Sequence, residues 1–574
     1  MIEKVSVSSV SNNIAPKRQN NAQPSFKGGL ADGAIWFVQQ CEKQPMVNVS
    51  VLDLSTAIIP RTIIETKESN SYAGFEAFRR EGSGLVVNCI IPSFIVMGIA
   101  KLLHNPIMGN FNKSNLTKTW ANEDAINKIH NFYSPYIGNT KLSQQEKVYN
   151  TFRDELTNLV GVDGHKTKDF AKIFNLEYDN SGKPLNIQNK KIHDAISQLT
   201  EAVLDEKYDS KKVKKAYATI VEETHIAENI RFKGDKGYFS NNLESVCEDT
   251  VKMLRGTLKE GISDTEGLTK YFNKAKKLVN WKSIGGLGVI IPLAISMQPI
   301  NRWITRKTSG IKGAPIYKDF DKQTEHKEPT DKEKKELLAQ KFISIGSMIG
   351  VAGLSMFMDR PVWKNIFQFK GIFPTMDQAR IISTATFASR MAVSEDKNEL
   401  REATVRDIAT FSSFYFLGDY VAKGIATFLE HANKDKNNGK GVHLINRLKE
   451  PLPKDANVMK KFWHWAKHTA LKSSDELATV QDKRLRTICQ IGNIAFSLLS
   501  LGVFIPIYTR SKTNKKREQE LAKLNAEKNA SQMSVSNSLT ETSKSANTTR
   551  TSTSNEFSKA MMKDSTAFKE FIHS

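Results

Sequence analysis

Hydrophobic residues along this chain are concentrated in four continuous runs that are separated by long charged stretches. The runs cover residues 84–103, 281–303, 342–358 and 487–509. Because a helix rises 1.5 Å per residue, about 20 apolar residues cross the roughly 30 Å of bilayer hydrocarbon. We therefore predict four transmembrane helices, of which the third is the shortest.

The second run begins and ends with tryptophan. Trp281 and Trp303 would stand about 33 Å apart along a helix, which is close to the separation of the two bilayer interfaces. Indole rings favour that boundary because one end is apolar and the other donates a hydrogen bond. Two alternatives stay open for each run, a re-entrant hairpin and a core helix of a soluble protein. Basic residues flank both ends of the runs, so the positive-inside rule sets no orientation.

Proline interrupts three of the runs, at Pro92, Pro292 and Pro506. A proline inside a helix leaves the carbonyl four residues earlier without its donor, and in lipid that carbonyl needs another partner. In two runs the residue four positions back is glycine, Gly288 or Gly502, and there we expect a neighbouring helix to approach.

The run at 342–358 carries Gly346 and Gly350, which form a small-xxx-small pair. Such pairs let two helix backbones approach closely in a membrane. We therefore predict a helix-packing surface on this span.

Residues 104–280 have a different pattern, in which charges of both signs alternate with apolar residues at helical spacing. One predicted helical face consists of Val148, Phe152, Leu156 and Leu159. This pattern is typical of a water-soluble helical domain. The predicted fold class is therefore all-α, a multi-pass helical membrane protein with an inserted soluble helical domain and disordered termini.

The remaining segments complete the predicted organisation. They are a disordered N-terminus (1–28), a membrane-proximal amphipathic segment (29–83), a charged connector (304–341), an amphipathic, aromatic-basic helical region (359–486), and a basic helix followed by a disordered Ser/Thr/Asn-rich tail (510–574). Within the aromatic-basic region, residues 408–428 would enter a membrane only if Asp419 and Lys423 pair one helical turn apart, since either charge alone is costly there.

The stretch VMKKFWHWAKHTALK, residues 458–472, predicts a helix with an aromatic face opposite a basic face. This pattern is typical of a helix that lies in the membrane interface and binds anionic lipid. The alternative is a surface helix that packs its aromatic residues on the protein itself. The predicted lipid-interface residues of the chain are Trp281, Trp303, Lys460, Lys461, Phe462, Trp463, Trp465 and Lys467.

Candidate chemistry is sparse. His464 and His468 have the spacing of a helical zinc pair, but a HExxH motif would need glutamate where Trp465 stands, and we favour a solvated basic face. No phosphate-binding loop, nucleophile elbow, dinucleotide fingerprint or CxxC motif is present. We predict no cofactor and no catalytic residue.

The formal net charge of +22 predicts a polyanionic partner. The densest basic clusters flank apolar runs, which favours anionic lipid head groups over nucleic acid. We therefore expect an integral, non-enzymatic membrane organiser or anchor that recruits protein partners through its soluble domain and tails. A transporter or channel component and a membrane-embedded enzyme without recognisable motifs stay open as alternatives.

Overall fold

The computed structural model describes residues 45–509, apart from 69, 104–119, 181, 183, 236–241, 310–329, 359–365, 372, 434–440 and 451, together with isolated positions outside that range. The predicted disordered terminus at 1–28 and the disordered tail within 510–574 lie outside the described residues. The chain divides into two units, Met1–Thr509 and Arg510–Ser574, and the description below concerns the first.

The described residues are mostly helical. The helices are α2 (Pro45–Leu52), α3 (Ile59–Glu68), α4 (Ser71–Leu85), α5 (Ile91–Leu103), α6 (Glu123–Ile137), α7 (Gln144–Thr157), α8 (Phe170–Ile173), α9 (Lys190–Leu204), α10 (Ser210–Thr224), α11 (Leu243–Lys259), α12 (Thr265–Ser309), α13 (Asp331–Met358), α15 (Met376–Val393), α16 (Lys397–Ser412), α17 (Gly418–Asn433), α18 (Val458–His468) and α19 (Val480–Ser497). Four π-helical segments join some of them: η1 (Asp53–Ile58), η2 (Val86–Ile90), η6 (Ser413–Leu417) and η8 (Leu498–Phe504).

Five helical stretches are long and apolar enough to cross a membrane, judged by length and composition. They are Met46–Lys67, Ser71–Leu103, Thr265–Thr308, Asp331–Met358 and Val480–Thr509. Four of them contain the predicted runs. The additional stretch lies in the segment 29–83, for which the sequence pattern predicted a membrane-proximal amphipathic segment and no span. The charge of Arg61 in this stretch is paired with Glu81 of α4 in the fold.

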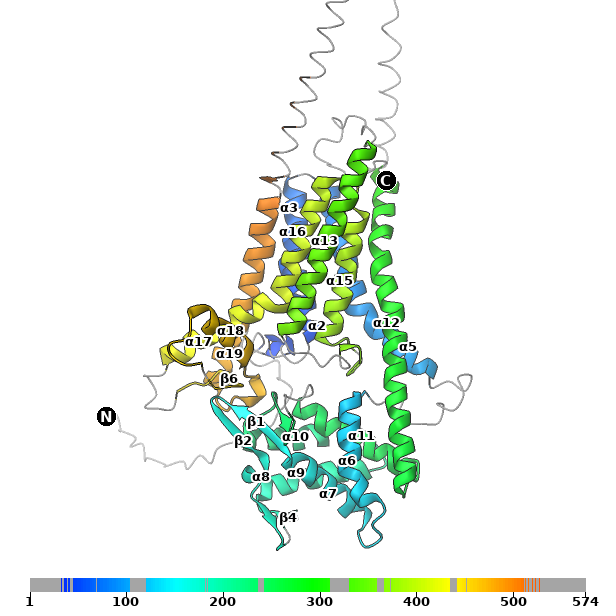
Figure 1. Cartoon of the computed structure of the whole chain (residues 1–574), viewed down its shortest axis with the longest axis vertical. Helices are drawn as coiled ribbons and strands as arrows, with labels where there is room; N and C mark the ends of the chain where they lie inside the picture. Colours follow the sequence, from blue (N-terminus) through cyan, green and yellow to red (C-terminus); the bar gives the residue numbers. More distant parts are fainter. Residues whose placement is uncertain are drawn as a thin grey trace, which may run out of the picture. The chain divides into compact units, whose positions relative to one another are not determined.

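These stretches form a helical bundle with two helices that are not continuously apolar, α15 and α16 (Figure 1). α15 packs against both α12 and α13, and α16 packs against α13 and α15. This part of the predicted amphipathic region 359–486 therefore packs within the bundle. The polar side chains of α15 face other helices: Gln378, Arg380, Ser383, Thr386, Ser389 and Arg390 are all buried.

Residues 120–280 form a globular domain around a single hydrophobic core. The sequence pattern predicted a helical domain, but the domain also contains short strands. β1 (Leu159–Asp163) pairs antiparallel with β2 (Lys166–Asp169) and β5 (Arg231–Phe232), and β3 (Leu176–Tyr178) pairs antiparallel with β4 (Pro184–Ile187).

Leu159 shows why the helical prediction extended too far. It is fully buried, as expected, but α7 ends at Thr157 and Leu159 begins β1. The strand sequence LVGVD contains two β-branched valines, which favour a strand, and a glycine, which disfavours a helix. Gly161 also permits the close approach of Ile226, since a Cβ at this position would stand 2.6 Å from that side chain.

One helix connects the globular domain with the bundle. α12 runs without interruption for 45 residues. Its first part, including Leu268, Phe272 and Leu278, is buried in the core of the globular domain. Its second part carries Leu287 and Ile290 into an apolar cluster of the bundle. The domain is therefore joined to the bundle by a continuous helix (Figure 1).

A second connection comes from the segment between α17 and α19. Its strands β6 (Ile445–Arg447) and β7 (Thr469–Leu471) pair antiparallel, and it also contains α18. The buried carboxylate of Glu476 accepts hydrogen bonds from the backbone N–H groups of Ala227 and Glu228, both at 2.9 Å. Lys472 pairs with Asp163 of β1. We call residues 442–479 the docking segment. Its contacts attach the globular domain to a second part of the chain.

The π-helical segments explain how three prolines are accommodated. η1, η2 and η8 each end two residues before a proline, at Pro60, Pro92 and Pro506. The residue before each proline donates its N–H five residues back, as Ile91 does to the carbonyl of Val86. A π-turn shifts the hydrogen-bond register within a helix. The backbone itself therefore satisfies the carbonyl six residues before each of these prolines.

Candidate functional site: a charge network inside an apolar bundle

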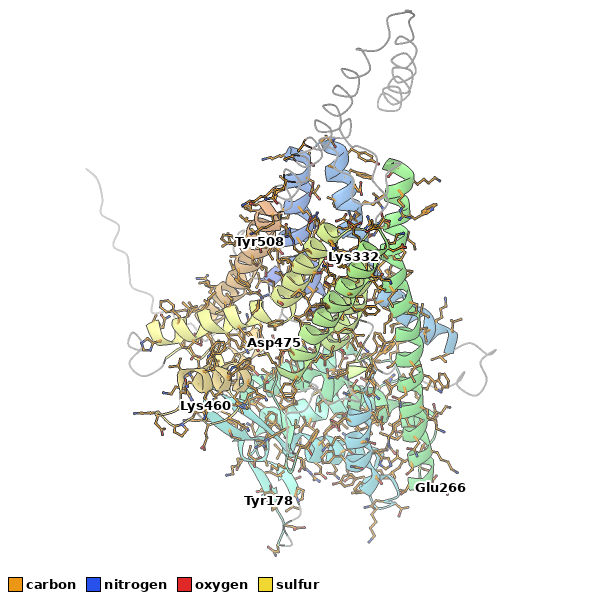
Figure 2. The ribbon with its side chains drawn as sticks, turned by 45° about the horizontal axis from the view of Figure 1, so that its top comes forward. Tyr178, Glu266, Lys332, Lys460, Asp475 and Tyr508 are labelled. Carbon is orange, nitrogen blue, oxygen red and sulfur yellow. The ribbon has the colours of Figure 1, made fainter. Side chains whose placement is uncertain are left out.

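The bundle is apolar on its outer surface. Phe342 and Ile343 of α13 are each 70% exposed, and Phe357 at the other end of the same stretch is 69% exposed. Exposed apolar surface of this extent is rare on soluble monomers and marks contact with a membrane or another protein. Figure 2 draws the side chains of the described residues and labels Lys332 and Tyr508 in the bundle.

The two tryptophans of α12 lie on this outer surface. Trp281 and Trp303 are each 61% exposed, at the two ends of the apolar part of the helix. Lys307 lies over the ring of Trp303, with its Nζ 5.4 Å from the ring centroid. Both indoles are therefore free to contact a surrounding interface.

The aromatic-basic helix α18 divides its apolar residues between two surroundings. Val458, Met459, Phe462 and Trp463 are exposed. Trp465 instead turns toward α17, where its Nε1 donates to the Thr427 hydroxyl at 3.3 Å. One side of α18 therefore packs on the protein, and the other faces outward.

The basic residues of α18 are also distributed over its surface. Lys460 and Lys461 are exposed (Figure 2). Lys467 lies over the Phe357 ring of α13, 5.0 Å from the centroid. This cation–π contact joins α18 to an apolar candidate span.

The two histidines of α18 lie side by side, with ring centroids 4.6 Å apart. His468 is buried and His464 is half-buried, so the expected solvated face does not describe His468. Among the described residues no group of three His, Cys, Asp or Glu side chains has a geometry that could hold a metal ion.

Asp419 and Lys423 form the pair that the sequence suggested, with 3.5 Å between Lys423 Nζ and Asp419 Oδ2. Asp419 is 66% exposed at its side chain, whereas Lys423 is buried and also donates to the Thr469 carbonyl of the docking segment. The stretch 408–428 is not among the candidate spans of the described residues. Lys423 is therefore covered by protein.

The glycines differ in their surroundings. A Cβ on Gly288, Gly346 or Gly350 would meet no atom within 4 Å, so none of the helices that the structure describes approaches closely at these glycines. At Gly502 a Cβ would stand 3.1 Å from the Thr56 carbonyl oxygen of the first candidate span. Close packing of two helices thus occurs at Gly502.

The most distinctive site lies inside the bundle and was not predicted. We call it the charge network, and its members are Arg61, Glu81, Arg390, Glu402, Arg406 and Asp407. Arg390 donates to Asp407 Oδ1 at 3.0 Å and to Glu81 Oε2 at 3.2 Å. Arg406 Nε donates to the same Asp407 oxygen at 3.1 Å. Three arginines and three carboxylates therefore balance one another in charge.

The N-terminal candidate span completes the network. Arg61 lies 3.2 Å from Glu81 and 3.5 Å from Glu402. Nearby polar bonds join α4 to α12, since Arg79 donates to Asn301 at 3.0 Å and to Thr305 at 3.0 Å. Asn301 lies two positions from Trp303, so these bonds lie near one end of the apolar part of α12.

Asp407 is the most deeply buried member, with a side chain that is 1% exposed. Both arginines bind its Oδ1, whereas its buried Oδ2 has no hydrogen-bond partner in the described structure. Buried charged groups inside a membrane are costly and mark functional or architectural sites. The only indication of the charge network in the sequence is that polar residues recur at helical spacing in 376–412.

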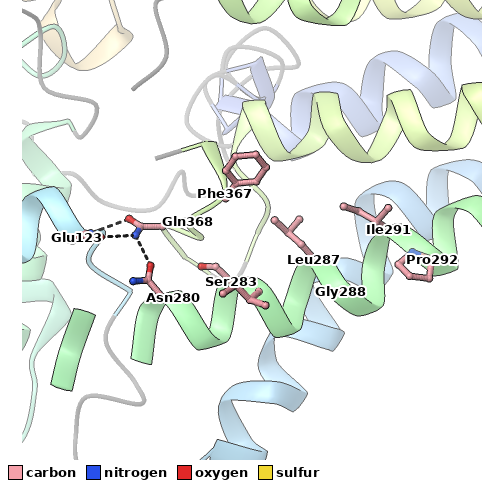
Figure 3. Close-up of a pocket in the computed structure, with 10 residues that line it drawn as sticks. Glu123, Asn280, Ser283, Leu287, Gly288, Ile291, Pro292, Phe367 and Gln368 are labelled. Atoms are coloured by element: carbon pink, nitrogen blue, oxygen red, sulfur yellow. Dashed lines mark hydrogen bonds between the residues drawn. The ribbon is translucent and has the colours of Figure 1, made fainter. Parts of the chain in front are cut away.

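A pocket of about 700 Å³ lies where the bundle meets the globular domain (Figure 3). Gln368 lies at its polar end, where its Nε2 donates to Asn280 Oδ1 at 2.7 Å and its Oε1 accepts the backbone N–H of Glu123 at 3.0 Å. Leu287, Ile291 and neighbouring residues of α12 line the rest. The pocket thus changes from polar to apolar along one helix.

The globular domain contains buried carboxyl groups of its own. Burial raises the pKa of Glu155 to about 8, against a smaller lowering effect of the hydrogen bond from Thr250, while the nearby Asp249 charge raises it further. Burial likewise raises the pKa of Asp249 to about 7. These carboxyls hold protons near neutral pH.

Compared with protein-family models, curated proteins and solved structures, the chain matches none of them. Its function must therefore be argued from the geometry described above.

Proposed function

We propose that this protein is an integral membrane scaffold that holds its globular domain in a fixed position at a membrane surface. The single observation that supports this proposal most strongly is the continuity of α12. The helix begins inside the core of the globular domain and continues into an apolar stretch with exposed tryptophans at both ends. A rigid helix of this kind transmits position and orientation, which a flexible linker would not do.

The docking segment supports the same role. Two of its contacts, Glu476 with the backbone of residues 227–228 and Lys472 with Asp163, bind the globular domain to the part of the chain that leads into α19. The domain is therefore attached to the bundle at two places far apart in sequence. Two attachments restrict rotation of the domain about α12, as a platform for partner proteins requires.

The exposed residues of α18 supply contact with lipid in this proposal. Phe462 and Trp463 would enter the interface, and Lys460 and Lys461 would contact anionic head groups. The partners of the scaffold are therefore an anionic bilayer and proteins that bind the globular domain.

The test places one cysteine at each end of α12. Glu266 is exposed at the domain end (Figure 2), Thr308 is exposed at the opposite end, and the four native cysteines are all buried. In sealed vesicles, a membrane-impermeant maleimide should label only one of Glu266→Cys and Thr308→Cys, and both after detergent is added. Labelling of both variants in intact vesicles would show that α12 does not cross the membrane.

The charge network favours a second candidate, a transport component. Asp407 has an unpartnered buried oxygen, and paired charges inside membranes often belong to ion or proton pathways. Proton or cation flux in proteoliposomes, lost in Asp407→Asn but retained in Asp419→Asn, would support this candidate. A scaffold predicts no flux above that of protein-free vesicles in either variant.

A further inference from the structure

The pocket at the junction of α12 and the globular domain has a lining that forms one continuous stripe. Its residues on α12 are Asn280, Ser283, Ile284, Leu287, Gly288, Ile291 and Pro292. They recur three and four positions apart, so they lie on one face of the helix. The stripe is about 18 Å long, which is comparable with one leaflet of a bilayer whose hydrocarbon is roughly 30 Å thick.

The polarity of the stripe has a direction. Its polar end carries Glu123, Asn280 and Gln368, and it adjoins Trp281, the tryptophan on the domain side of α12. From Ile284 onward the lining is apolar (Figure 3). A bilayer has the same order of polarity, with head groups at the interface and acyl chains inside. An amphiphile that entered from the bilayer would therefore bind without a change of orientation.

The polar end presents hydrogen-bond acceptors. Glu123 supplies a carboxylate, which can only accept when ionised, and none of the ten lining residues is a lysine or arginine. Gln368 donates through its Nε2 to Asn280 Oδ1 and, at 3.4 Å, to Oε2 of the Glu123 carboxylate, and its Oε1 accepts the Glu123 backbone N–H, which holds these groups in place. Such a site favours a head group with N–H or O–H donors over a bare phosphate.

We propose that this pocket binds one membrane lipid whose head group donates hydrogen bonds, through an ammonium or hydroxyl group, to the Glu123 carboxylate, with an acyl chain along α12. The proposal rests on the proposed membrane location of α12. It goes beyond that location, because it assigns a specific lipid site to a protein that would otherwise have only non-selective lipid contacts.

Gly288 offers a sharp test because a side chain at this position has open space around it and would enter the pocket. Leucine there fills the apolar stripe and also favours the helix over glycine. Gly353 on α13 is a matched control, since it is also helical, exposed and open. The full-length protein is reconstituted with trace phosphatidylethanolamine or phosphatidylcholine that carries a photoreactive acyl chain. These two lipids have the same net charge, but only the first has N–H donors.

We expect phosphatidylethanolamine to label the peptide that contains residues 283–292 more strongly than phosphatidylcholine does. Gly288→Leu should lower this labelling about tenfold or more, equivalent to ~1.4 kcal/mol of binding, whereas Gly353→Leu should not. Glu123→Gln should bring the two lipids to equal labelling. Melting temperatures of the variants show whether each remains folded.

Two results would overturn the proposal. Equal labelling by both lipids in the wild type would remove the head-group recognition, and unchanged labelling in Gly288→Leu would remove the pocket as the site. Labelling of the exposed α13 stretch separates this failure from failure of the membrane location. If α13 is labelled and the pocket is not, only the lipid site is wrong, and if neither is labelled, the membrane location is wrong.

Discussion

Arg390 of α15 donates to the carboxylate of Asp407 of α16 across 3.0 Å, and both side chains are almost completely buried. The pair does not stand alone, because Arg406 and Glu81 bind the same groups. A buried ion pair contributes to stability only when its remaining hydrogen-bonding groups are also satisfied. The charge network supplies partners for Asp407 Oδ1 and for two nitrogens of Arg390, while Asp407 Oδ2 has none among the described residues, and its members tie α3, α4, α15 and α16 together.

Removal of one member should expose this dependence. We expect Asp407→Ala to lower the free energy of unfolding by about 3–5 kcal/mol, because Arg390 and Arg406 lose an acceptor they share. Unfolding in mild detergent, followed by circular dichroism, measures the change. Asp455→Ala is the control, since this carboxyl lies on an exposed turn, and its effect should stay within about 0.5 kcal/mol. Equal losses in both variants would contradict the role of the network.

The stability of the globular domain should fall as pH rises through neutrality. Burial raises the folded-state pKa of Glu155 to about 8, so between about pH 4.5 and 8 the folded state holds a proton that the unfolded chain has released. This stabilising contribution is complete below the unfolded pKa and is lost as pH approaches 8, by about 1.4 kcal/mol per pH unit for one proton.

Glu155→Gln should remove that pH dependence while retaining an acceptor for the Thr250 hydroxyl, which lies 2.8 Å away in the wild type. We expect the variant to gain in melting temperature relative to the wild type as pH is raised from 5 to 8. If the melting temperatures of the two proteins change equally with pH across this range, Glu155 does not hold a proton in the folded state. Asp249 contributes in the same direction up to about pH 7 and remains in both proteins.

The docking segment should detach when Glu476 is removed. Its carboxylate accepts two backbone N–H groups, those of Ala227 and Glu228, and its side chain is buried. Each buried donor left without a partner costs about 1–3 kcal/mol. Limited proteolysis of Glu476→Ala should therefore cleave within 442–479 faster than in the wild type. Asp455→Ala, on an exposed turn of the same segment, should leave the cleavage rate unchanged, and cleavage at the same rate in all three proteins would count against the second attachment.

The outward face of α18 should report contact with lipid. Met459 is 61% exposed, and the burial of the four native cysteines makes a single introduced thiol selective for a fluorescent label. An environment-sensitive probe on Met459→Cys should shift its emission to shorter wavelength when the protein is moved from an amphipathic polymer, without detergent, into anionic bilayers. A probe on Asp455→Cys should shift less. Identical shifts at both positions would show that α18 does not lie in the interface.

A substantial part of the fold could be predicted from local sequence. The apolar runs and the tryptophan spacing of 281–303 identify candidate spans, because the transfer of a long helix out of water depends on composition and length. The Asp419–Lys423 pair could also be predicted, since residues four apart on a helix are neighbours whatever surrounds them. The pairing says nothing, however, about what covers Lys423.

Only the tertiary structure could bring Glu81 and Arg390 together, because 309 positions separate them and no local period relates them. For the same reason, local sequence could not show that the polar faces of α15 and α16 meet charges from other helices. Leu159 belongs to a strand because β2 and β5 supply hydrogen bonds that a local pattern cannot show. Sequence by itself identified four of the five candidate spans, because length and composition define them. The partners of buried charges and of β1 were decided by packing, since Coulomb and hydrogen-bond energies depend on distance in space.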